Sequence, residues 1–246
     1  MEDKIDKLVE WLQLQVQKAN ANGLVVGVSG GIDSAVVAYL AKRAFPNDCI
    51  GVIMPCKSNP KDEEDAMRVI SSSNIKYITV DLTETHNILF STIESRLEQI
   101  KDWNESKAKL GDANTRARLR MTTLYAVGNN YNYLVCGTDN AAEWHTGYFT
   151  KYGDGGVDLV PLVNFTKGEV RQLARVLGVP AEIIEKAPSA GLWDDQTDEN
   201  EMGTTYDMID KYLKGEEIPE KDKAIIDRMH TRSEHKRRLA AAPPIF

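Results

Sequence analysis

Residues Ser29 to Ser34 have the side chains and spacing best suited to phosphate chemistry. They read Ser-Gly-Gly-Ile-Asp-Ser, after an apolar run from Leu24 to Val28 and before a helix-like apolar pattern that begins at Ala35. Glycines in such a loop expose backbone N–H groups, and the N-terminus of the following helix attracts an anion. The stretch therefore predicts a loop that binds the phosphates of a nucleotide.

Three kinds of phosphate loop compete for this stretch. The P-loop of kinases is excluded because no lysine stands before the helix. The dinucleotide fingerprint is excluded because the spacing from Gly27 is G-V-S-G-G and the second apolar run ends in Met54-Pro55 rather than in an acid. The Ser-Gly-Gly-x-Asp-Ser loop of the ATP pyrophosphatases matches in full. A tight turn with a capping aspartate is the simpler alternative.

Asp33 is an unusual residue for an anion site. A carboxylate repels phosphate unless it also binds a cation, and Mg²⁺ carried on the phosphates of ATP meets that need. We therefore expect Asp33 to be a ligand of magnesium.

The composition limits the class of protein. The chain has 246 residues, 42% of them hydrophobic, and a net charge of −7, which suits one α/β domain and argues against sequence-blind nucleic-acid binding. Cys49, Cys56 and Cys136 are too few and too scattered for a disulfide framework, and the first and last lie in apolar runs typical of buried thiols. No run is long enough to span a membrane, so we expect a cytoplasmic protein with no membrane or nucleic-acid partner.

Strand-like and helix-like patterns alternate along the chain. This order predicts an α/β fold with a doubly wound parallel sheet and helices on both faces, Rossmann-like, in a single domain over residues 1–246. Thr166 and Glu169 form a capping-box pattern at the start of one helix. The polar segments 101–112 and 189–201 are expected to be mobile. The expected strands are Leu24–Val28, Cys49–Met54, Lys76–Val80 and Tyr133–Gly137, and the expected helices are an amphipathic one containing Ile5 to Val16, then 33–45, 62–73, 88–100, 113–127, one near Glu143, 166–177, 204–213 and 221–232.

Further stretches make the sequence resemble a known family. The loop is similar to that of the N-type ATP pyrophosphatases (adenine nucleotide alpha hydrolase-like), and four later stretches narrow the resemblance to the NAD synthetases. They are NTRARLRM from Asn114, GTDNAAEWHTGYFTKYGDGGVDLVPL from Gly137, KAPSAGLWDDQTDENEMG from Lys186 and EHKRR from Glu234. The resemblance implies a homodimeric ligase of NAD biosynthesis. It would use ATP, Mg²⁺ and ammonia to amidate deamido-NAD through an NAD-adenylate, releasing AMP and pyrophosphate.

The resemblance also assigns residues to roles. The implied magnesium ligands are Asp33 and Glu143. The implied catalytic residues are Asp33, Lys151 and Asp158. The implied ATP-binding residues are Gly27, Val28, Ser29, Gly30, Gly31, Ile32, Asp33, Ser34, Thr138, Lys167 and Ser189. The implied deamido-NAD-binding residues are Arg118, Lys151, Asp158, His235 and Lys236.

Several of these residues have plainer interpretations. Glu143 could be an acid favoured by a helix N-terminus, and Thr138 could be an ordinary N-cap. A solvated helix face is the plain interpretation of Arg116 and Arg120. Lys167 is expected in the first turn of a helix, where a cation is disfavoured unless an anion such as phosphate lies beside it.

Two other functions share the loop. A tRNA-modifying ATP pyrophosphatase is disfavoured by the acidic charge balance, and a non-catalytic ATP sensor would not need Lys151 and Asp158. The segment before the first strand is a single expected helix, which leaves no room there for a glutamine amidase domain. We therefore expect ammonia as the nitrogen source.

Overall fold

A four-stranded parallel sheet forms the centre of the protein. The computed structural model describes residues 1–189 and 197–245. The strand order is β3-β2-β1-β4, and all neighbouring strands are parallel. The strands are β1 (Gly23–Gly27), β2 (Cys49–Ile53), β3 (Lys76–Thr79) and β4 (Tyr133–Cys136). The predicted parallel α/β fold is confirmed, with each strand ending one residue earlier than predicted.

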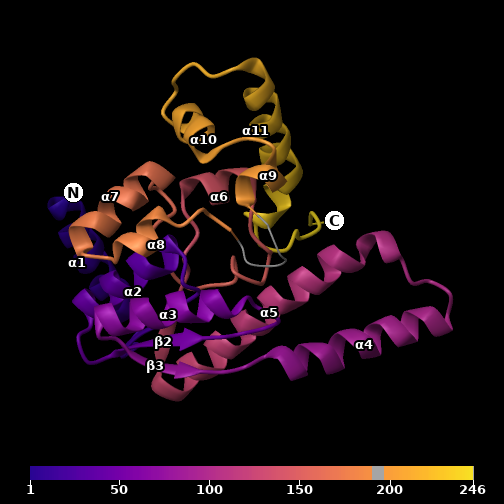
Figure 1. Cartoon of the computed structure of the whole chain (residues 1–246), viewed down its shortest axis with the longest axis horizontal. Coiled ribbons are helices and arrows are strands. Elements are labelled where there is room, and N and C mark those ends of the chain that lie inside the picture. The colour runs from indigo at the N-terminus through magenta and orange to yellow at the C-terminus, as the bar shows by residue number, and fades with distance from the viewer. Residues whose placement is uncertain (190–196, 246) are drawn as a thin grey trace.

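Helices cover both faces of this sheet (Figure 1). Side chains of β1 alternate between two cores, with Leu24 and Val26 in one and Val25 in the other. The first core lies under α2 (Ile32–Ala44) and α3 (Pro60–Ser73), with α1 (Glu2–Lys18) and α7 (Lys167–Leu177) packed against α2. The second core lies under α5 (Glu105–Tyr131), which packs on β1 and β4.

The strand order places a crevice between β1 and β4. The chain leaves β1 for β2 on one side and later returns to β4 on the other side of β1. At such a reversal the connections after the two strands part, and ligands of open parallel sheets bind there. The loop after β1 and the residues after β4 therefore face each other, as the sequence predicted.

An arm of two helices projects from the sheet. It consists of α4 (Thr83–Gln99) and the first half of α5, and it extends to the right in Figure 1. The helix expected over 113–127 begins earlier, because α5 already starts at Glu105, and the mobility of segment 101–112 stays a prediction. The joint is held by an edge contact between Trp103 and Phe90, with ring centroids 6.1 Å apart, and by a 2.9 Å hydrogen bond from Trp103 Nε1 to Glu105 Oε2.

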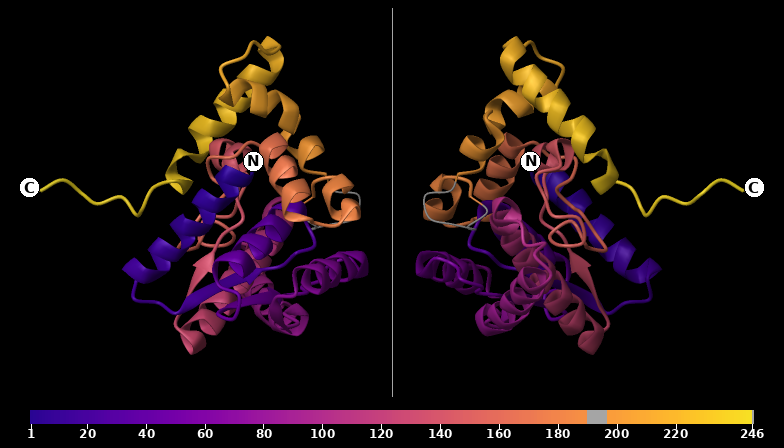
Figure 2. Two further views of the ribbon diagram at one scale, coloured as in Figure 1. Left: turned by 90° about the vertical axis from the view of Figure 1, so that its left-hand side faces the viewer. Right: turned by 90° about the vertical axis from the view of Figure 1, so that its right-hand side faces the viewer.

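A small helical unit follows the sheet at the C-terminal end. Its core joins Ala142 of α6 to residues of α9, α10 and α11, and it lies at the top of Figure 1. In Figure 2 the residues after this unit leave the body as an extended tail. The helices of this unit are α6 (Ala141–Thr146), α9 (Asp198–Met202), α10 (Tyr206–Leu213), α11 (Glu220–Ser233) and a 3₁₀ turn (Glu234–Lys236). The short helix α8 (Ala181–Glu185) follows α7 and packs on α7 and α2.

Two short helices, α8 and α9, were not predicted. Each of α8 and α9 has only five residues, too few for a helical pattern to show in the sequence. The segment 189–201, predicted to be mobile, is helical from Asp198 onward, and its residues 190–196 lie outside the described part of the chain.

All three cysteines are buried, as predicted for Cys49 and Cys136. Among residues 1–189 and 197–245, no helix combines the length and the apolar character needed to cross a membrane.

Candidate active site

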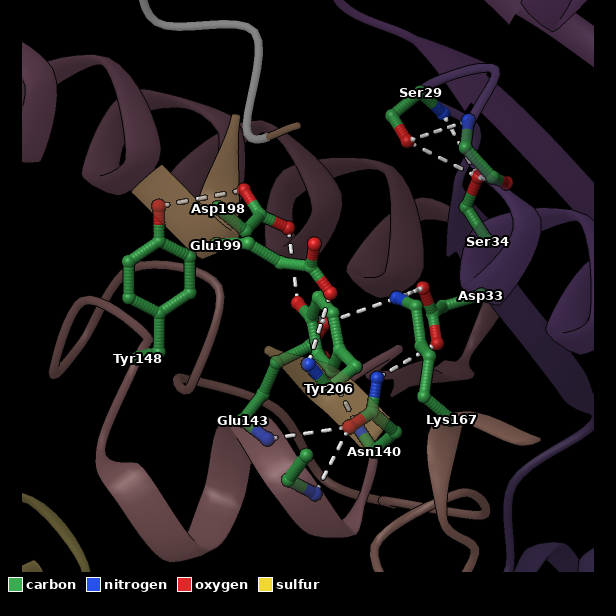
Figure 3. Close-up of polar contacts among 12 residues, drawn as sticks. Ser29, Asp33, Ser34, Asn140, Glu143, Tyr148, Lys167, Asp198, Glu199 and Tyr206 are labelled. Carbon is green, nitrogen blue, oxygen red and sulfur yellow. Dashed lines mark hydrogen bonds and ion pairs between the residues drawn. The ribbon is translucent and has the colours of Figure 1, made fainter. Parts of the chain in front are cut away.

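The loop after β1 is closed by its own serines. The hydroxyl of Ser34 accepts from the Ser29 backbone N–H at 3.2 Å, lies 3.1 Å from the Ser29 hydroxyl and donates to the Gly31 carbonyl at 2.9 Å (Figure 3). Gly30 has φ +81°, and a Cβ there would lie 2.7 Å from the carbonyl oxygen of Asp62. Glycine is therefore required at this position by both conformation and space.

A cavity of about 330 Å³ opens in front of this loop. All the residues predicted to bind ATP line it except Gly30, and the predicted metal ligand Glu143 lines it as well. It continues past Arg120 and Met121 of α5 to Thr150 and Asp154. The structure thus gathers the predicted ATP site into one hollow at the β1–β4 crevice.

The wall of this cavity holds a buried lysine between two carboxylates. The Nζ of Lys167 lies 2.5 Å from Asp33 Oδ2 and 3.2 Å from Glu143 Oε1, and its side chain is 3% exposed. Asp33 comes from the first turn of α2, Glu143 from α6 and Lys167 from the first turn of α7. Three separate elements thus bring their N-terminal turns to one point.

Asn140 connects the two carboxylates and was not among the residues predicted from the sequence. Its amide nitrogen donates to Asp33 Oδ1 at 2.9 Å, and its amide oxygen caps α6 by accepting from the backbone of Ala142 and Glu143. Glu143 Oε2 accepts in return from the Asn140 backbone N–H at 3.1 Å, which completes a capping box. Asn140 with Glu143 three residues on was a local signal that could have revealed this helix start.

Burial and pairing set the charges of this cluster. Burial alone would lower the pKa of Lys167, but the carboxylates of Asp33 and Glu143 outweigh it, so the pKa is raised and the ammonium stays charged. Burial raises the pKa of Glu143 to about 7, even though Lys167 opposes the shift. Lys167 therefore keeps its charge between the two carboxylates before any ligand enters.

Lys167 also occupies the first turn of α7, where a cation is disfavoured. The predicted remedy was an anion such as phosphate. In the structure the compensation comes from protein carboxylates, because Asp210 of α10 accepts from the backbone N–H groups of Lys167 at 3.0 Å and Gly168 at 2.8 Å. The predicted capping box of Thr166 and Glu169 is confirmed at the same helix end.

The carboxylates beside the phosphate loop suit Mg²⁺ only together with a nucleotide. Within residues 1–189 and 197–245, no three His, Cys, Asp or Glu side chains are grouped to hold a metal alone. Magnesium is, however, usually bound by one or two carboxylates together with substrate phosphates. Asp33 and Glu143 supply those carboxylates beside the phosphate loop. Asp139, on the same cavity, has a buried Oδ2 with no hydrogen-bond partner. The residues present therefore fit a magnesium ion carried in with a nucleotide.

The later ATP-binding candidates lie on the rim. Thr138 lines the cavity and is not an N-cap, because Asn140 has that position. Ser189 also lines it. Shortly before Ser189, Lys186 donates to Asp62 Oδ1 at 2.9 Å and to Asp65 Oδ2 at 2.7 Å, which fixes this segment to α3.

Two arginines were misjudged. A solvated face was the plain interpretation of Arg116 and Arg120, but Arg116 is buried and pairs with Asp112 at 2.6 Å. Arg120 lines the cavity and donates to the Met54 carbonyl at 3.1 Å and to the Ser58 hydroxyl at 3.2 Å. The error arose because α5 is covered on more than one side, by α4, the sheet and the segment after β2.

Four of the five candidates for deamido-NAD binding form a second cluster, outside the cavity lining. Arg118 Nη2 donates to the Lys151 carbonyl at 3.3 Å, and Lys151 Nζ donates to the carbonyls of His235 at 2.5 Å and Arg238 at 2.9 Å. Lys236 Nζ donates to the carbonyls of Gly147 and Phe149 at 2.8 and 2.7 Å. These bonds fix the C-terminal turn against the segment after α6.

Asp158 does not join this cluster. Its Oδ1 accepts from the Tyr125 hydroxyl at 3.0 Å, and its Oδ2 accepts from the Val135 backbone N–H at 2.8 Å. Through these two bonds Asp158 connects its segment to α5 and to β4.

Comparison with known proteins identifies the family. The family model described as NAD synthase matches residues 4–240. The chain belongs to the NAD synthase family. Its relatives include the NH(3)-dependent NAD(+) synthetase of Alkaliphilus oremlandii, which is 54% identical over all of this chain and 98% of its own length.

Solved structures of this family share the fold. An NMN synthetase from Francisella tularensis has a TM-score of 0.92 and 41% identity, over 99% of this chain and 98% of that one. An NH3-dependent NAD synthetase from Campylobacter jejuni, solved with nitrate, has a TM-score of 0.77 and 27% identity over the same shares. Membership of the NAD synthase family confirms the predicted ligase class. It supports neither the tRNA-modifying enzyme nor the ATP sensor.

Proposed function

We propose that this NAD synthase amidates deamido-NAD to NAD, with ATP and ammonia as co-substrates and AMP and pyrophosphate as by-products. The names of the relatives support the reaction, and one observation carries it to this chain. The phosphate loop, the buried Lys167 and the carboxylates of Asp33 and Glu143 line a single cavity at the β1–β4 crevice.

The reaction requires an activated carboxylate, because the oxygen of a carboxylate is a poor leaving group. The nicotinate carboxylate attacks the α-phosphorus of ATP, the bond to the β-phosphate oxygen breaks, and pyrophosphate leaves. Ammonia then attacks the acyl carbon of the adenylate, AMP departs, and the surplus proton passes to solvent. The loop N–H groups and Lys167 stabilise the charge that collects on the pyrophosphate.

Asp33 and Glu143 would hold the magnesium ion. When bound, the ion neutralises phosphate charge and orients the pyrophosphate as a leaving group. The protein's own contribution is position. Asn140 fixes Asp33 and Glu143 relative to each other, and Lys167 keeps the two carboxylates together before the nucleotide enters.

The second cluster is our proposed site for the pyridine dinucleotide. Arg118, Lys151, His235 and Lys236 lie beside the part of the cavity formed by Thr150. Cationic side chains suit the phosphates of a dinucleotide, and Lys151 would neutralise negative charge there. For Asp158 the bonds to Tyr125 and Val135 support a role through the placement of α5, and the predicted catalytic role remains a proposal.

Free ammonia is the proposed nitrogen source, as in the names of the relatives. Release of ammonia from glutamine by a cysteine would need an accessible thiolate. Burial raises the pKa of Cys49 to about 11 and also raises those of Cys56 and Cys136. None of the three thiols is suited to act as that nucleophile.

A second candidate function is the amidation of a shorter pyridine substrate, a mononucleotide in place of the dinucleotide. The Francisella structure, an NMN synthetase, has the TM-score of 0.92, against 0.77 for the Campylobacter NAD synthetase. That likeness favours a test of the mononucleotide acid, which would give NMN by the same adenylation and amidation. The two substrates differ only beyond the reacting carboxylate, so the same cavity would serve both.

A homodimer is the proposed assembly, and the cytoplasm, where ATP is available, is the proposed compartment. One region of the surface, β3 with the α4–α5 arm, carries many of the large exposed apolar side chains. Singly scattered exposed apolar residues are ordinary, whereas several in one region make that region a candidate interaction surface. The set is Tyr77, Ile78, Ile88, Leu89, Ile93, Ile100 and Leu110.

A product assay tests the function. Purified protein is given ATP, Mg²⁺ and either deamido-NAD or nicotinate mononucleotide, with ammonium or glutamine, and AMP, pyrophosphate and the amide are measured. We expect AMP and NAD in equal amounts with ammonium. Equal rates with glutamine would overturn the nitrogen source, and faster turnover of the mononucleotide would favour the second candidate.

A further inference from the structure

Tyr206 lies at the centre of the buried polar cluster, although it comes from a distant helix. It is the first residue of α10 and is 1% exposed. Its hydroxyl lies 2.9 Å from Glu143 Oε1 and 2.9 Å from Asp198 Oδ2 (Figure 3). A buried tyrosine hydroxyl needs a hydrogen-bond partner, but this one is aimed at the carboxylate expected to hold the metal.

The hydroxyl completes the restraint on Glu143. The Asn140 backbone N–H donates to Oε2 of Glu143 at 3.1 Å, and Lys167 Nζ donates to Oε1 at 3.2 Å. The Tyr206 hydroxyl lies 2.9 Å from Oε1 and shares its single proton between Glu143 and Asp198. Without the hydroxyl, Lys167 would be the remaining partner of Oε1 among these contacts. The carboxylate could then turn toward the ammonium and away from a metal ion.

The ring of Tyr206 serves a separate purpose. Its centroid lies 4.6 Å from Lys167 Nζ, within the range of a cation–π contact. Replacement by phenylalanine keeps the ring and its packing and removes only the hydroxyl. The two contributions of the side chain can therefore be separated by experiment.

Tyr206 is itself held in place from two directions. Its backbone N–H donates to Glu199 Oε1 of α9 at 2.9 Å. One turn later on α10, Asp210 accepts from the first backbone N–H groups of α7. The hydroxyl therefore has a fixed position relative to both α6 and α7.

We infer that Tyr206 is a positioning residue, which holds Glu143 in the orientation that binds the metal of the metal–nucleotide complex. The inference rests on the proposed function only for the identity of Asp33 and Glu143 as metal ligands. Partners that orient a metal ligand commonly change metal affinity by about 10-fold to 100-fold when removed. A residue that merely fills the core would change stability and leave metal affinity alone.

The test measures metal binding without turnover. Mn²⁺ is titrated into the full-length protein bound to the α,β-methylene analogue of ATP, and free Mn²⁺ is followed by electron paramagnetic resonance. For Tyr206→Phe we expect the dissociation constant of Mn²⁺ to rise about tenfold. The matched control is Tyr212→Phe on the same helix. It removes a hydroxyl that donates to Asp227 at 2.6 Å. For it we expect no change beyond twofold.

A second variant covers the case in which Tyr206→Phe fails to fold. Glu199→Ala removes the acceptor of the Tyr206 backbone N–H and leaves the Tyr206 hydroxyl and the residues lining the cavity unchanged, so we expect Mn²⁺ affinity to fall, by less than in Tyr206→Phe. Unchanged affinity in Tyr206→Phe, or in Glu199→Ala where Tyr206→Phe does not fold, would overturn the inference. If the wild type bound Mn²⁺ as expected but formed no AMP from either pyridine substrate, the proposed function would fail while the role of Tyr206 stood.

Discussion

The ammonium of Lys167 lies 2.5 Å from the carboxylate of Asp33, and the two side chains are only 3% and 16% exposed. This pair joins the first turn of α7 to the first turn of α2, directly behind the phosphate loop. A buried ion pair is costly to break from one side, because the remaining charge loses its partner. The pair therefore links the stability of the fold to the proposed nucleotide site.

Asp33→Asn should separate these two contributions. We expect AMP formation to slow at least about 100-fold, because several kcal/mol of charge stabilisation through the metal are lost. Stability should fall by about 1–3 kcal/mol, since Lys167 keeps Glu143 as its partner. The measurements are single-turnover AMP release and urea unfolding. Turnover near the wild-type rate would show that Asp33 is not a metal ligand.

Arg120→Met tests the cavity wall. The guanidinium donates to the Met54 carbonyl and the Ser58 hydroxyl. Its loss leaves the Met54 carbonyl without this donor inside the wall, while the Ser58 hydroxyl still accepts from the Cys56 backbone N–H. At about 1–3 kcal/mol for such a loss, kcat/KM should fall roughly 10-fold to 100-fold. Steady-state kinetics with ATP as the varied substrate provide the measurement. Wild-type kcat/KM in the variant would contradict a role of Arg120 in shaping the nucleotide cavity.

Lys186→Met tests the segment that carries Ser189. Lys186 bonds both Asp62 and Asp65, and although burial acts to lower its pKa, these carboxylates raise it overall. Without it, the segment loses its link to α3, and we expect the KM for ATP to rise about tenfold. Lys211→Met is the matched control, because its pairing with Asp207 is at the surface. An equal change in both variants would contradict the assignment.

The pH dependence of stability should reflect His145. Burial, the neighbouring His230 and Arg237 lower its pKa from 6.5 to about 4, and its ring stacks on that of His230 at 4.2 Å. Between pH 6.5 and 4 the unfolded chain binds a proton that the folded protein resists. The stability present above pH 6.5 is therefore lost as pH falls through this window. Urea unfolding in EDTA should show a shallower loss for His145→Phe, and parallel curves would contradict the interpretation.

Ile88→Glu tests the proposed dimer. Ile88 is 62% exposed on the α4–α5 arm, and two-fold symmetry would place the new charge on the interface twice. We expect the dimer to weaken by more than about tenfold in analytical ultracentrifugation, since desolvating a charge is costly. Val176→Glu, on the exposed side of α7, is the control and should leave the assembly unchanged. A monomeric wild type would end the proposal.

Features encoded by neighbouring residues were predictable from the sequence. The Ser29–Ser34 loop, the four strands and the capping box of Thr166 each depend on a short stretch, and each was found within a residue or two. Asn140 belongs to the same class, since its capping box with Glu143 spans four residues. It was overlooked although a local signal was present.

Features set by contacts between distant segments were not predictable in the same way. Tyr206 reaches Glu143 across 63 positions of the chain, and Asp210 reaches Lys167 across 43. The periodicity of α10 indicates only that one face of the helix is buried. It does not indicate which other helices that face contacts. Likewise, the burial of Arg116 and Arg120 depends on how the arm folds against the segment after β2.

Tyr206 and Asp210 lie one turn apart on α10, and they bond the first turns of α6 and α7 respectively. A small rotation of α10 would therefore displace the first turn of α6 and the first turn of α7 together. Substitutions at Ile209 or Ile226, in the small core of this helical unit, should consequently give a folded enzyme with reduced activity. Harmful variants of this protein are thus expected well outside the nucleotide pocket, in residues that touch no substrate.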